Sequence, residues 1–490
     1  MSIQTTVDNI EDLYDLCIIG AGISGLNALF SAMHYLPQSA RVLLVDRNPT
    51  CGGMWTQTYD YVRLHQPHQM FTVGDMGWLW DKPPEYLATG REVLWHLQSC
   101  LDRMRGKVRL TERYETDCLR IEEIKKKSSE PIAMVHLKGR HGTHSKIAAS
   151  RAIHAAGWNV PSIKPLVLTS KKIISTCPMN LSEIDTKSTC PALVIGGGKT
   201  GMDTALTLMN GDNPRNIALV NGKGAIFGNR DRMFPTGARR WWQGAMVGSI
   251  SADIVGQFNG TNVLSTFEYF RTRYAISPDM QGAQYMFSTM SGAEAERLSQ
   301  GLASIRHGYL EDVIDGAEGP VAVLRDGASF SIPHDTLVVN CTGHFAALSD
   351  KRPAVLSQMG TILYINPRAS IYFLSTSASY FLTHAFFLNL LRTMPLYVLD
   401  MNSLKGHPPQ FYFLTCLTHS FHNMMVFMNH LPLSVFSRCG LDINRWFPLH
   451  RRLISFARIK LRKHRYIGHS RTVLDRLHSN GSISCQQNLD

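Results

Sequence analysis

Two glycine-rich segments constrain the fold of this chain more than any other feature. The first, Gly20–Gly25, reads GAGISG and follows the apolar run DLCII; the second, Gly196–Gly201, reads GGGKTG and follows ALVI. Each pattern predicts a buried strand, a tight turn and a helix whose N-terminus can bind a pyrophosphate. Because the pattern occurs twice, we expect an α/β fold with two Rossmann-like dinucleotide-binding domains, the second inserted into the first.

The residue that would face the adenosine ribose differs between the two units. An acid near the end of the second strand commonly binds this ribose. After the first turn the residue is Asp46, and after the second it is the neutral Asn221, followed by Lys223, Arg230 and Arg232. A missing carboxylate with cations nearby favours the 2′-phosphate of NADPH. The sequence therefore predicts FAD in the first unit and NADPH in the second, although Lys223 could instead be a solvated loop lysine.

These motifs name the candidate cofactor contacts. For FAD the candidates are Gly20, Gly22, Ile23, Ser24, Gly25, Asp46 and Arg47. For NADPH they are Gly196, Gly198, Lys199, Thr200, Gly201 and Lys223. Ordinary glycine turns of an α/β protein are the plainer interpretation, and the repetition of strand, turn and ribose position at similar spacing argues against it.

The motifs also divide the chain into four expected segments. These are 1–165, the first part of the FAD-binding domain; 166–334, the NADPH-binding domain; 335–400, the second part of the FAD-binding domain; and 401–490, a basic C-terminal extension. The run DTLVVNCTGH at 335–344 is similar to the strand ending AAG at 155–157. We expect both strands to return the chain to the FAD-binding domain.

Positive charge is concentrated near the C-terminus. The net charge is +12, and ten Lys or Arg residues but one acid, Asp475, lie between Arg445 and Arg476. Residues 451–463 predict a basic amphipathic helix, which could lie on an anionic membrane surface or pack on its own domain. No nucleic-acid recognition motif accompanies the charge, so we expect no nucleic-acid partner.

Two long stretches, 369–391 and 406–437, carry no formal charge. Both contain polar residues and histidines, so neither predicts a membrane span. The first is expected to form a strand, a turn and a buried helix that closes the FAD-binding domain, and the second a hydrophobic hairpin at a membrane surface or a cover over the active site. His419 and His422 lack a third ligand at a matching spacing, so no metal site is expected.

Compartment and packing are indicated by composition. The segment MSIQTTVDNIEDLYD has no basic and apolar signal pattern, and none of the ten cysteines forms a CxxC pair. We therefore expect a reducing, cytoplasmic environment, with peripheral membrane contact through the basic region as an addition. Aromatic residues of the segment 222–305 could line a substrate pocket or form core; they are Trp241, Trp242, Phe258, Phe267, Tyr269 and Phe270.

Further motifs resemble a known family. Together with the first turn and Asp46, the run CGGMW at 51–55 resembles the FAD site of the class B flavin-dependent monooxygenases. The run YDYVRLHQPHQMF at 59–71 looks most like the plant indole-3-pyruvate monooxygenase branch, and GKTGMD at 198–203 is similar to that branch's second turn. The run CTGH at 341–344 resembles the family's ATGY strand end, with His344 in place of Tyr. The resemblance covers about residues 12–400.

The resemblance implies an enzyme that uses FAD and NADPH to insert one oxygen atom from O₂ into a small organic substrate through a C4a-hydroperoxyflavin. It implies that Gly53, Met54 and Trp55 flank the FAD and that His65 and Gln66 lie near the isoalloxazine. Gln66 is then the candidate partner of the peroxide, and with His65 it forms the candidate catalytic pair. All five residues lie within two short runs of the sequence.

One departure from the family keeps other functions open. The fingerprint F-x-G-x-x-x-H-x-x-x-[YFW] is absent, and the corresponding stretch, 173–179, contains no histidine. A reductase or oxidase with the same cofactors and no oxygen transfer is therefore the first alternative. A non-catalytic protein that keeps the fold is the second, against which the intact glycines and Asp46 argue.

Overall fold

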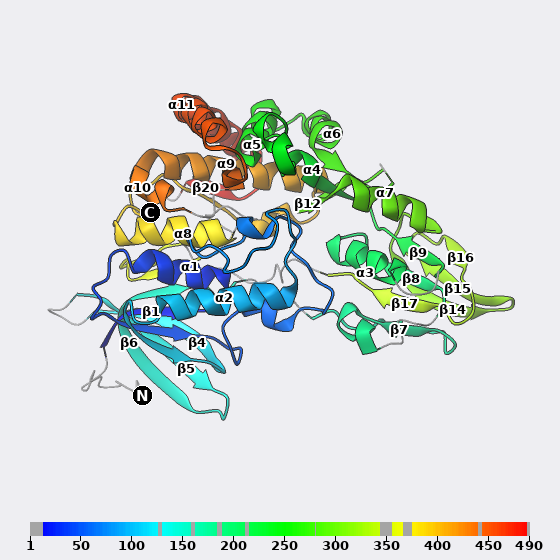
Figure 1. Ribbon diagram of the computed structural model, residues 1–490, viewed down its shortest axis with the longest axis horizontal. Coiled ribbons are helices and arrows are strands. Elements are labelled where there is room, and N and C mark those ends of the chain that lie inside the picture. Colours follow the sequence, from blue (N-terminus) through cyan, green and yellow to red (C-terminus); the bar gives the residue numbers. More distant parts are fainter. Residues whose placement is uncertain are drawn as a thin grey trace.

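Two sheets built largely of parallel strands and a helical layer make up the protein (Figure 1). The computed structural model describes residues 13–125, 130–157, 162–183, 189–210, 215–279, 281–343, 355–365, 375–439 and 443–487. The first sheet lies at the lower left of Figure 1, the second at the right, and helices cover the top.

The first sheet contains the first glycine turn. Its strands are β1 (Leu13–Ile19), β2 (Arg41–Val45), β3 (Arg109–Arg113), β4 (Thr116–Ile124), β5 (Ile132–Gly139), β6 (His144–His154) and β18 (Ile362–Tyr364). Their order is β3-β2-β1-β6-β5-β4, with β18 also paired to β6; β4 and β5 form an antiparallel hairpin. In register, Ile18 of β1 lies between Leu44 of β2 and Ile153 of β6, and all three are buried. Runs buried on both faces are typical of parallel strands covered by helices.

The second sheet contains the second glycine turn. Its strands are β7 (Ile174–Thr176), β8 (Ala192–Ile195), β9 (Ile217–Val220), β13 (Ser304–Arg306) and β17 (Leu337–Asn340). All pairs are parallel, in the order β13-β9-β8-β17-β7. Helices α3 (Lys199–Met209) and α7 (Gly292–Gly301) pack with this sheet in one hydrophobic cluster. The other face of the sheet packs against residues 310–332, so helices cover one face of this parallel sheet.

The expected boundary at residue 335 is wrong for strand β17. This strand pairs with β8 and β7, so it belongs to the second sheet and does not return the chain to the first. The chain rejoins the first sheet at β18, where Ile362 pairs with Ala152 of β6. An apolar run such as LVVN can be buried in either sheet, and its pairing is decided by neighbours that are distant in sequence.

The uncharged stretch 369–391 provides the expected buried helix. Helix α8 (Ser375–Phe387) packs on α1 (Ile23–Ala32) within the main hydrophobic core. The Ser379 hydroxyl donates a hydrogen bond to the Ser24 carbonyl at 2.5 Å, which fixes the two helices at the first turn of α1. Helix α2 (Gly90–Met104) packs on the same core and begins with a capping box between Thr89 and Glu92.

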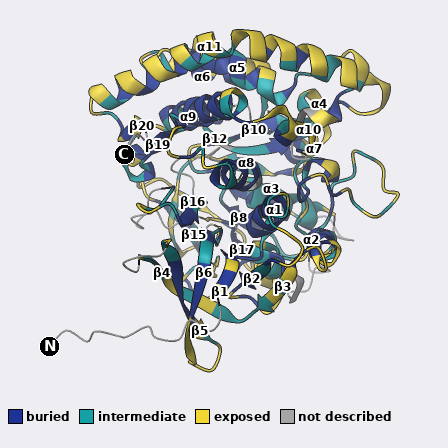
Figure 2. Cartoon of the chain, turned by 90° about the vertical axis from the view of Figure 1, so that its left-hand side faces the viewer, coloured by how far each residue is buried: buried dark blue, intermediate teal, exposed yellow. Residues whose placement is uncertain are grey.

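The C-terminal region is part of the core and is not a separate extension. Helix α9 (Pro409–His430) is buried along most of its length, and it shares a hydrophobic cluster with α5 (Val247–Gln257), α6 (Val263–Tyr274) and α11 (Leu449–Ser479). Figure 2 shows α9 beneath α11. The predicted hydrophobic hairpin at a surface is wrong, because residues 409–430 form one largely buried helix. Truncating a fully buried side chain such as Phe413 would cost about 3–5 kcal/mol of stability.

Smaller elements connect these layers. The strands are β10 (Ala225–Asn229), β11 (Ala275–Ile276) and β12 (Gln284–Met290) in one sheet, β14 (Leu310–Gly316), β15 (Gly319–Leu324) and β16 (Ser329–Ser331) in another, and β19 (Tyr397–Leu399) paired with β20 (Cys485–Gln487). The short helices are α4 (Arg230–Met233) and α10 (Leu433–Ser437). Phe258, Phe267 and Phe270 are buried in the cluster around α9, so these aromatics form core, whereas Trp241 and Trp242 are exposed.

Candidate functional site

The first glycine turn has the geometry of a phosphate-binding loop. Gly20 has a φ of +105°, a conformation that L side chains rarely adopt. A Cβ at Gly25 would clash with the Gly20 carbonyl oxygen, so the third glycine is required for close packing of strand and helix. Helix α1 begins after Gly22 without a side-chain cap, and its first turn contains no acidic residue. Its N-terminus is therefore suited to an anionic group.

A second glycine segment forms the opposite side of this turn. Gly53, with a φ of +58°, opens a short 3-10 helix, η1 (Gly53–Gln57). A Cβ at Gly53 would lie 2.8 Å from the Gly22 Cα, and one at Gly22 would lie 3.2 Å from the Gly53 Cα. The two backbones thus meet where a side chain would separate them. This surface, free of side chains, fits a pyrophosphate held by backbone N–H groups.

The predicted ribose acid is buried and fixed by the turn itself. The Oδ2 atom of Asp46 accepts the Ala21 N–H at 2.5 Å, and Oδ1 accepts the Asn48 N–H at 2.8 Å. A carboxylate has about four acceptor positions, so two are left for ribose hydroxyls. Arg47 and Met54 are exposed beside this site. Trp55 packs edge-on against Phe71 with ring centroids 5.6 Å apart.

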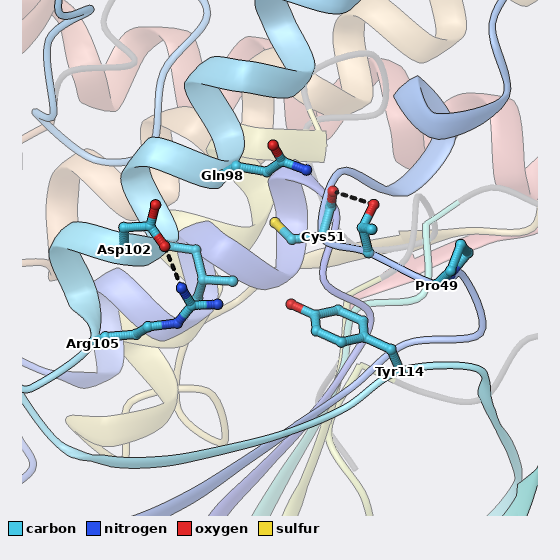
Figure 3. Close-up of a pocket in the computed structure, with 8 residues that line it drawn as sticks. Pro49, Cys51, Gln98, Asp102, Arg105 and Tyr114 are labelled. Atoms are coloured by element: carbon cyan, nitrogen blue, oxygen red, sulfur yellow. Dashed lines mark hydrogen bonds and ion pairs between the residues drawn. The ribbon is translucent and has the colours of Figure 1, made fainter.

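A cavity of about 280 Å³ lies on the other side of Cys51 (Figure 3). Gln98, Asp102 and Arg105 reach it from α2, and Tyr114 faces them from the end of β3. The Arg105 guanidinium pairs with Asp102 and with Glu112, and the Cys51 thiol donates to the Ala21 carbonyl oxygen at 3.2 Å. Burial raises the pKa of Cys51, so the thiol stays protonated. Of these groups, Cys51 contacts the glycine turn directly.

The second turn repeats the geometry of the first. Gly196 has a φ of +109°, and a Cβ at Gly201 would clash with the Gly196 carbonyl oxygen. Helix α3 begins after Gly198 without a side-chain cap or an acid in its first turn. A Cβ at Gly198 would meet no other atom within 4 Å, so the protein itself does not require glycine there. A ligand that lies close to this backbone would require glycine at position 198.

The residues that follow strands β6 and β17 pack against the first glycine of the first and second turn, respectively. A Cβ at Gly20 would clash with the Ala155 carbonyl oxygen after β6, and one at Gly196 would lie 3.0 Å from the Cys341 carbonyl oxygen after β17. The similarity of these two strand ends is therefore real, but each closes the turn of its own sheet. His344, the last residue of the CTGH motif, lies outside the described residues.

The second ribose position contains an acid that the sequence did not reveal. The Asn221 side-chain amide donates to the Asp279 Oδ2 atom at 3.0 Å, and Asp279 is also within 3.3 Å of His307 Nε2. Asn221 lies so close to the turn that a Cβ at Gly197 would clash with its Oδ1 atom. Lys223 is exposed two residues further on.

The other two cations that follow Asn221 make their contacts elsewhere. Arg230 is ion-paired with Glu294 at 2.5 Å, and the Arg232 guanidinium lies over the Tyr274 ring, 5.2 Å from its centroid. Lys223 is therefore the cation of this group that we retain as a candidate for the 2′-phosphate.

Residues 59–66 connect the first unit to the second. The Tyr59 hydroxyl donates to the Asp203 Oδ2 atom on α3 at 3.5 Å, and the Tyr61 hydroxyl lies 2.8 Å from the Thr204 hydroxyl. Asp203 also forms an ion pair with Lys199 at the start of α3. Lys199, a predicted NADPH contact, is therefore partly neutralised by a residue of its own helix. Burial raises the pKa of Asp203 despite this partner.

His65 lies at this junction as a neutral acceptor. The Thr289 backbone N–H of β12 donates to His65 Nδ1 at 3.2 Å, and Arg230 donates to the His65 carbonyl oxygen at 3.4 Å. Burial, with the nearby positive charges of Lys199 and Arg230, lowers the pKa of His65 to about 3. The imidazole is therefore neutral near pH 7, with Nδ1 unprotonated.

Gln66, the next residue, has an unsatisfied acceptor. Among the described residues, its buried Oε1 atom has no hydrogen-bond partner. A buried acceptor without a donor costs about 1–3 kcal/mol, so a donor from a bound molecule would be favourable here. In the described part of the chain, no group of three or more His, Cys, Asp or Glu side chains could hold a metal ion.

Sequence comparison links these features to redox enzymes. Residues 14–243 match the family model described as pyridine nucleotide-disulphide oxidoreductase. An uncharacterized protein of Mycobacterium tuberculosis is 24% identical over 357 residues, which are 69% of this chain and 62% of that protein. Monooxygenase PC-14 of Penicillium crustosum is 27% identical over 224 residues, 44% of this chain and 37% of the relative. The chain thus spans about three fifths of the length of the first of these relatives.

Solved structures with a similar chain path include a flavin-containing monooxygenase from Stenotrophomonas maltophilia, with a TM-score of 0.46 and 11% identity over 78% of this chain and 98% of that one. An S-allyl-L-cysteine S-oxygenase from Allium sativum has a TM-score of 0.46 and 12% identity over 96% and 99% of the two chains. The sequence matches are thus to an oxidoreductase family model and to relatives that include two monooxygenases.

Proposed function

We propose that this protein is an FAD- and NADPH-dependent monooxygenase that transfers one oxygen atom from O₂ to a small organic substrate. The observation that carries the proposal is the pair of uncapped glycine turns, one in each of the two main sheets. Its sequence relatives include two fungal monooxygenases. The narrower resemblance to the plant indole-3-pyruvate monooxygenase branch stays a prediction.

The first unit supplies the groups that would hold FAD. The N-terminus of α1 and the backbone of Gly22 and Gly53 would bind the pyrophosphate, and the free acceptor positions of Asp46 would bind the ribose. Bound flavin supplies the redox chemistry, accepting hydride from a nicotinamide and activating O₂. The chain has only to bind it, orient it and exclude water.

The second unit supplies the groups that would hold NADPH. The N-terminus of α3 and the open backbone of Gly198 would bind its pyrophosphate. The exposed ammonium group of Lys223 would bind the 2′-phosphate. The acid near this position, Asp279, already accepts the Asn221 amide and lies 3.3 Å from His307 Nε2.

The junction orients the reacting partners. Thr289 holds His65, whose imidazole is neutral near pH 7 because burial lowers its pKa, so we assign it a positioning role. The Gln66 carbonyl oxygen would accept a hydrogen bond from flavin or substrate, and we assign this amide the direct contact. No side-chain nucleophile is required by this scheme.

A reductase or oxidase is the second candidate, favoured by one observation. The stretch 173–179, where the family fingerprint is expected, forms strand β7 and its flanks and contains no histidine. Without oxygen transfer, each NADPH consumed would give one H₂O₂ or would reduce another acceptor. The two functions therefore differ in where the oxygen atoms go.

The test follows both oxygen atoms. The purified flavoprotein is supplied with NADPH and ¹⁸O₂ and a panel of amines, thioethers and carbonyl compounds, and H₂O₂ is measured against NADPH consumed. If the protein is a monooxygenase, one class of compound lowers the H₂O₂ yield, and its product carries one ¹⁸O atom. An H₂O₂ yield equal to NADPH consumption with every class would establish an oxidase instead.

Cofactor placement is tested by the same substitution at the two turns. Gly22→Asp puts a carboxylate at the proposed FAD pyrophosphate, and Gly198→Asp puts one at the proposed NADPH pyrophosphate. We expect the first variant to lose FAD during purification, and the second to keep FAD while its KM for NADPH rises. FAD retained by Gly22→Asp would refute the placement.

A further inference from the structure

Helix α11 has apolar residues on the face opposite its packing surface. Leu449, Leu453 and Leu461 are 62%, 58% and 85% exposed. With the exposed Ala457 they follow i, i+4 spacing, which places them on one line along the helix. The buried positions, among them Ile459 and Leu474, face α9 and α5. Figure 2 shows the outer side of α11 exposed along its length. Packing on the protein's own core therefore explains one face of the helix. It does not explain the line of exposed Leu449, Leu453 and Leu461, which we call the leucine ridge.

Positive charge surrounds the leucine ridge. Arg458, Lys460, Arg462 and Arg465 are exposed, and the helix contains no Asp or Glu before Asp475. Exposed leucines among arginines are unfavourable in water alone, because each leaves apolar surface hydrated. A surface that is both apolar and anionic would satisfy both groups.

Two tryptophans extend the ridge at the beginning of the helix. Trp241 and Trp242, at the end of a 3-10 helix, η4 (Gly237–Trp241), are 51% and 67% exposed. The Arg451 guanidinium fixes this segment to α11 by donating to the carbonyl oxygens of Arg240 at 2.9 Å and Gly244 at 3.0 Å. The Trp241 ring is stacked on His450 with centroids 5.6 Å apart. Tryptophan is enriched where proteins meet the lipid headgroup layer.

We propose that this face, Trp241 and Trp242 with the outer side of α11 from Leu449 to Arg465, docks on an anionic phospholipid bilayer. The leucines and tryptophans would enter the boundary between headgroups and acyl chains, and the bases would lie against the phosphates. None of the described helices is long and apolar enough to span a membrane, so the helix would lie on the surface.

Charge distinguishes a bilayer from a second copy of the chain. Two copies joined through this face would bring their basic residues together, and like charges at an interface oppose association. A nucleic acid would neutralise the basic residues but would leave the leucines hydrated, which is unfavourable. Anionic lipid is the occupant that matches both the apolar and the basic residues.

The test is flotation of the full-length flavoprotein with phosphatidylcholine vesicles, with and without phosphatidylglycerol. We expect binding to the anionic vesicles that weakens as ionic strength rises, because salt screens surface charge. Leu453→Ser with Leu461→Ser should weaken binding roughly 10-fold or more, since two apolar side chains no longer enter the bilayer. Arg458→Gln with Lys460→Gln and Arg462→Gln should weaken it at least as much, again roughly 10-fold or more.

Matched variants elsewhere on the surface serve as controls. Leu79→Ser with Leu119→Ser removes two other exposed leucines, and Lys138→Gln with Lys146→Gln and Lys171→Gln removes three other exposed charges. Both controls should bind vesicles as the parent does, and FAD content reports that each variant is folded. Equal loss in the controls, or equal binding to neutral vesicles, would overturn the proposal.

Two other results would also overturn it. A monomer–dimer shift caused by the leucine substitutions, without vesicle binding by the parent, would assign the face to self-association. Binding of a DNA duplex in preference to anionic vesicles would assign it to nucleic acid.

Discussion

The Thr289 backbone N–H donates a hydrogen bond to His65 Nδ1 at 3.2 Å and so joins strand β12 to the segment that follows the first nucleotide unit. The bond fixes the imidazole as an acceptor at Nδ1. Because the two glycine turns lie on different sheets, a ligand bound at one must be oriented against a ligand bound at the other. The bond between His65 and Thr289 is one of the direct contacts that maintain this geometry.

Substitution of His65 should therefore loosen the junction. His65→Leu leaves the Thr289 N–H without its acceptor, and we expect the free energy of unfolding to fall by about 1–3 kcal/mol. His65→Asn places a carbonyl oxygen near the position of Nδ1 and should keep most of that stability and of the rate of flavin reduction by NADPH. Chemical denaturation and anaerobic stopped-flow reduction measure the two effects. Equal behaviour of both variants would show that the bond has no orienting role.

Buried histidines should make the protein sensitive to acid. Burial lowers the pKa values of His96, His384 and His422 to about 3 from 6.5. Between these values the unfolded chain binds protons that the folded chain does not, so stability falls as pH decreases below about 6.5 and is unaffected by these groups above it. Near pH 5.5 we expect a slope of roughly 3–4 kcal/mol per pH unit from the three together.

One of these histidines allows a matched test. His96 is stacked on Trp78 with ring centroids 4.1 Å apart, so His96→Phe keeps an aromatic ring there and removes the titration. Near pH 5.5 the slope of unfolding free energy against pH should decrease by about 1.2 kcal/mol per pH unit. An unchanged slope between pH 5 and 6.5 would mean that His96 is protonated in the folded protein.

Two glycines of the second turn should respond differently to alanine. A Cβ at Gly201 would clash with the Gly196 carbonyl oxygen, whereas one at Gly198 would meet nothing within 4 Å. We expect Gly201→Ala to lower the melting temperature and Gly198→Ala to leave the free energy of unfolding within about 0.5 kcal/mol of the parent. Gly198→Ala should nevertheless raise the KM for NADPH, because its methyl group would face the ligand. Normal NADPH kinetics in Gly198→Ala would show that the nucleotide does not approach this backbone.

The features that could be predicted from the sequence are those that depend on residues close together in the chain. The glycine turns and Asp46 follow from the requirements of one strand, one turn and one helix, and the buried helix α8 follows from its apolar run. Strand β17 could not be assigned, because its sequence specifies burial but not the sheet. Its pairing with β8 depends on contacts across the fold.

In the candidate site too, contacts between residues far apart in the chain could not be predicted from the sequence. Asp279 is 58 residues from Asn221, and Thr289 is 224 residues from His65, and neither belongs to a motif. Asp279 and Thr289 both belong to the segment 275–290, which contains β11 and β12, and no local pattern predicts that this segment lies beside Asn221 and His65. The buried position of α9 is of the same kind, since its uncharged sequence would suit a surface hairpin equally well.

Lys223 should determine the preference for NADPH over NADH. Lys223→Ala removes the exposed ammonium group that would face the 2′-phosphate, so the KM for NADPH should rise roughly 5-fold or more, whereas that for NADH should change little. Lys172→Ala, an exposed lysine near β7, is the control. Equal changes for the two nucleotides would remove Lys223 from the phosphate site.

Substitution of Gln66 should raise stability but lower the fraction of NADPH consumption that leads to oxygen transfer. Gln66→Leu replaces the buried, unpartnered acceptor by an apolar side chain of similar size, so the protein stripped of cofactor should become more stable by about 1–3 kcal/mol. If the amide contacts flavin or substrate, the same variant should release more H₂O₂ per NADPH consumed in the presence of substrate. Denaturation of the apoprotein and H₂O₂ yield measure the two effects separately. A gain in stability without a change in the H₂O₂ yield would show that Gln66 has no part in oxygen transfer. Its unpaired oxygen would then lower stability without contacting flavin or substrate.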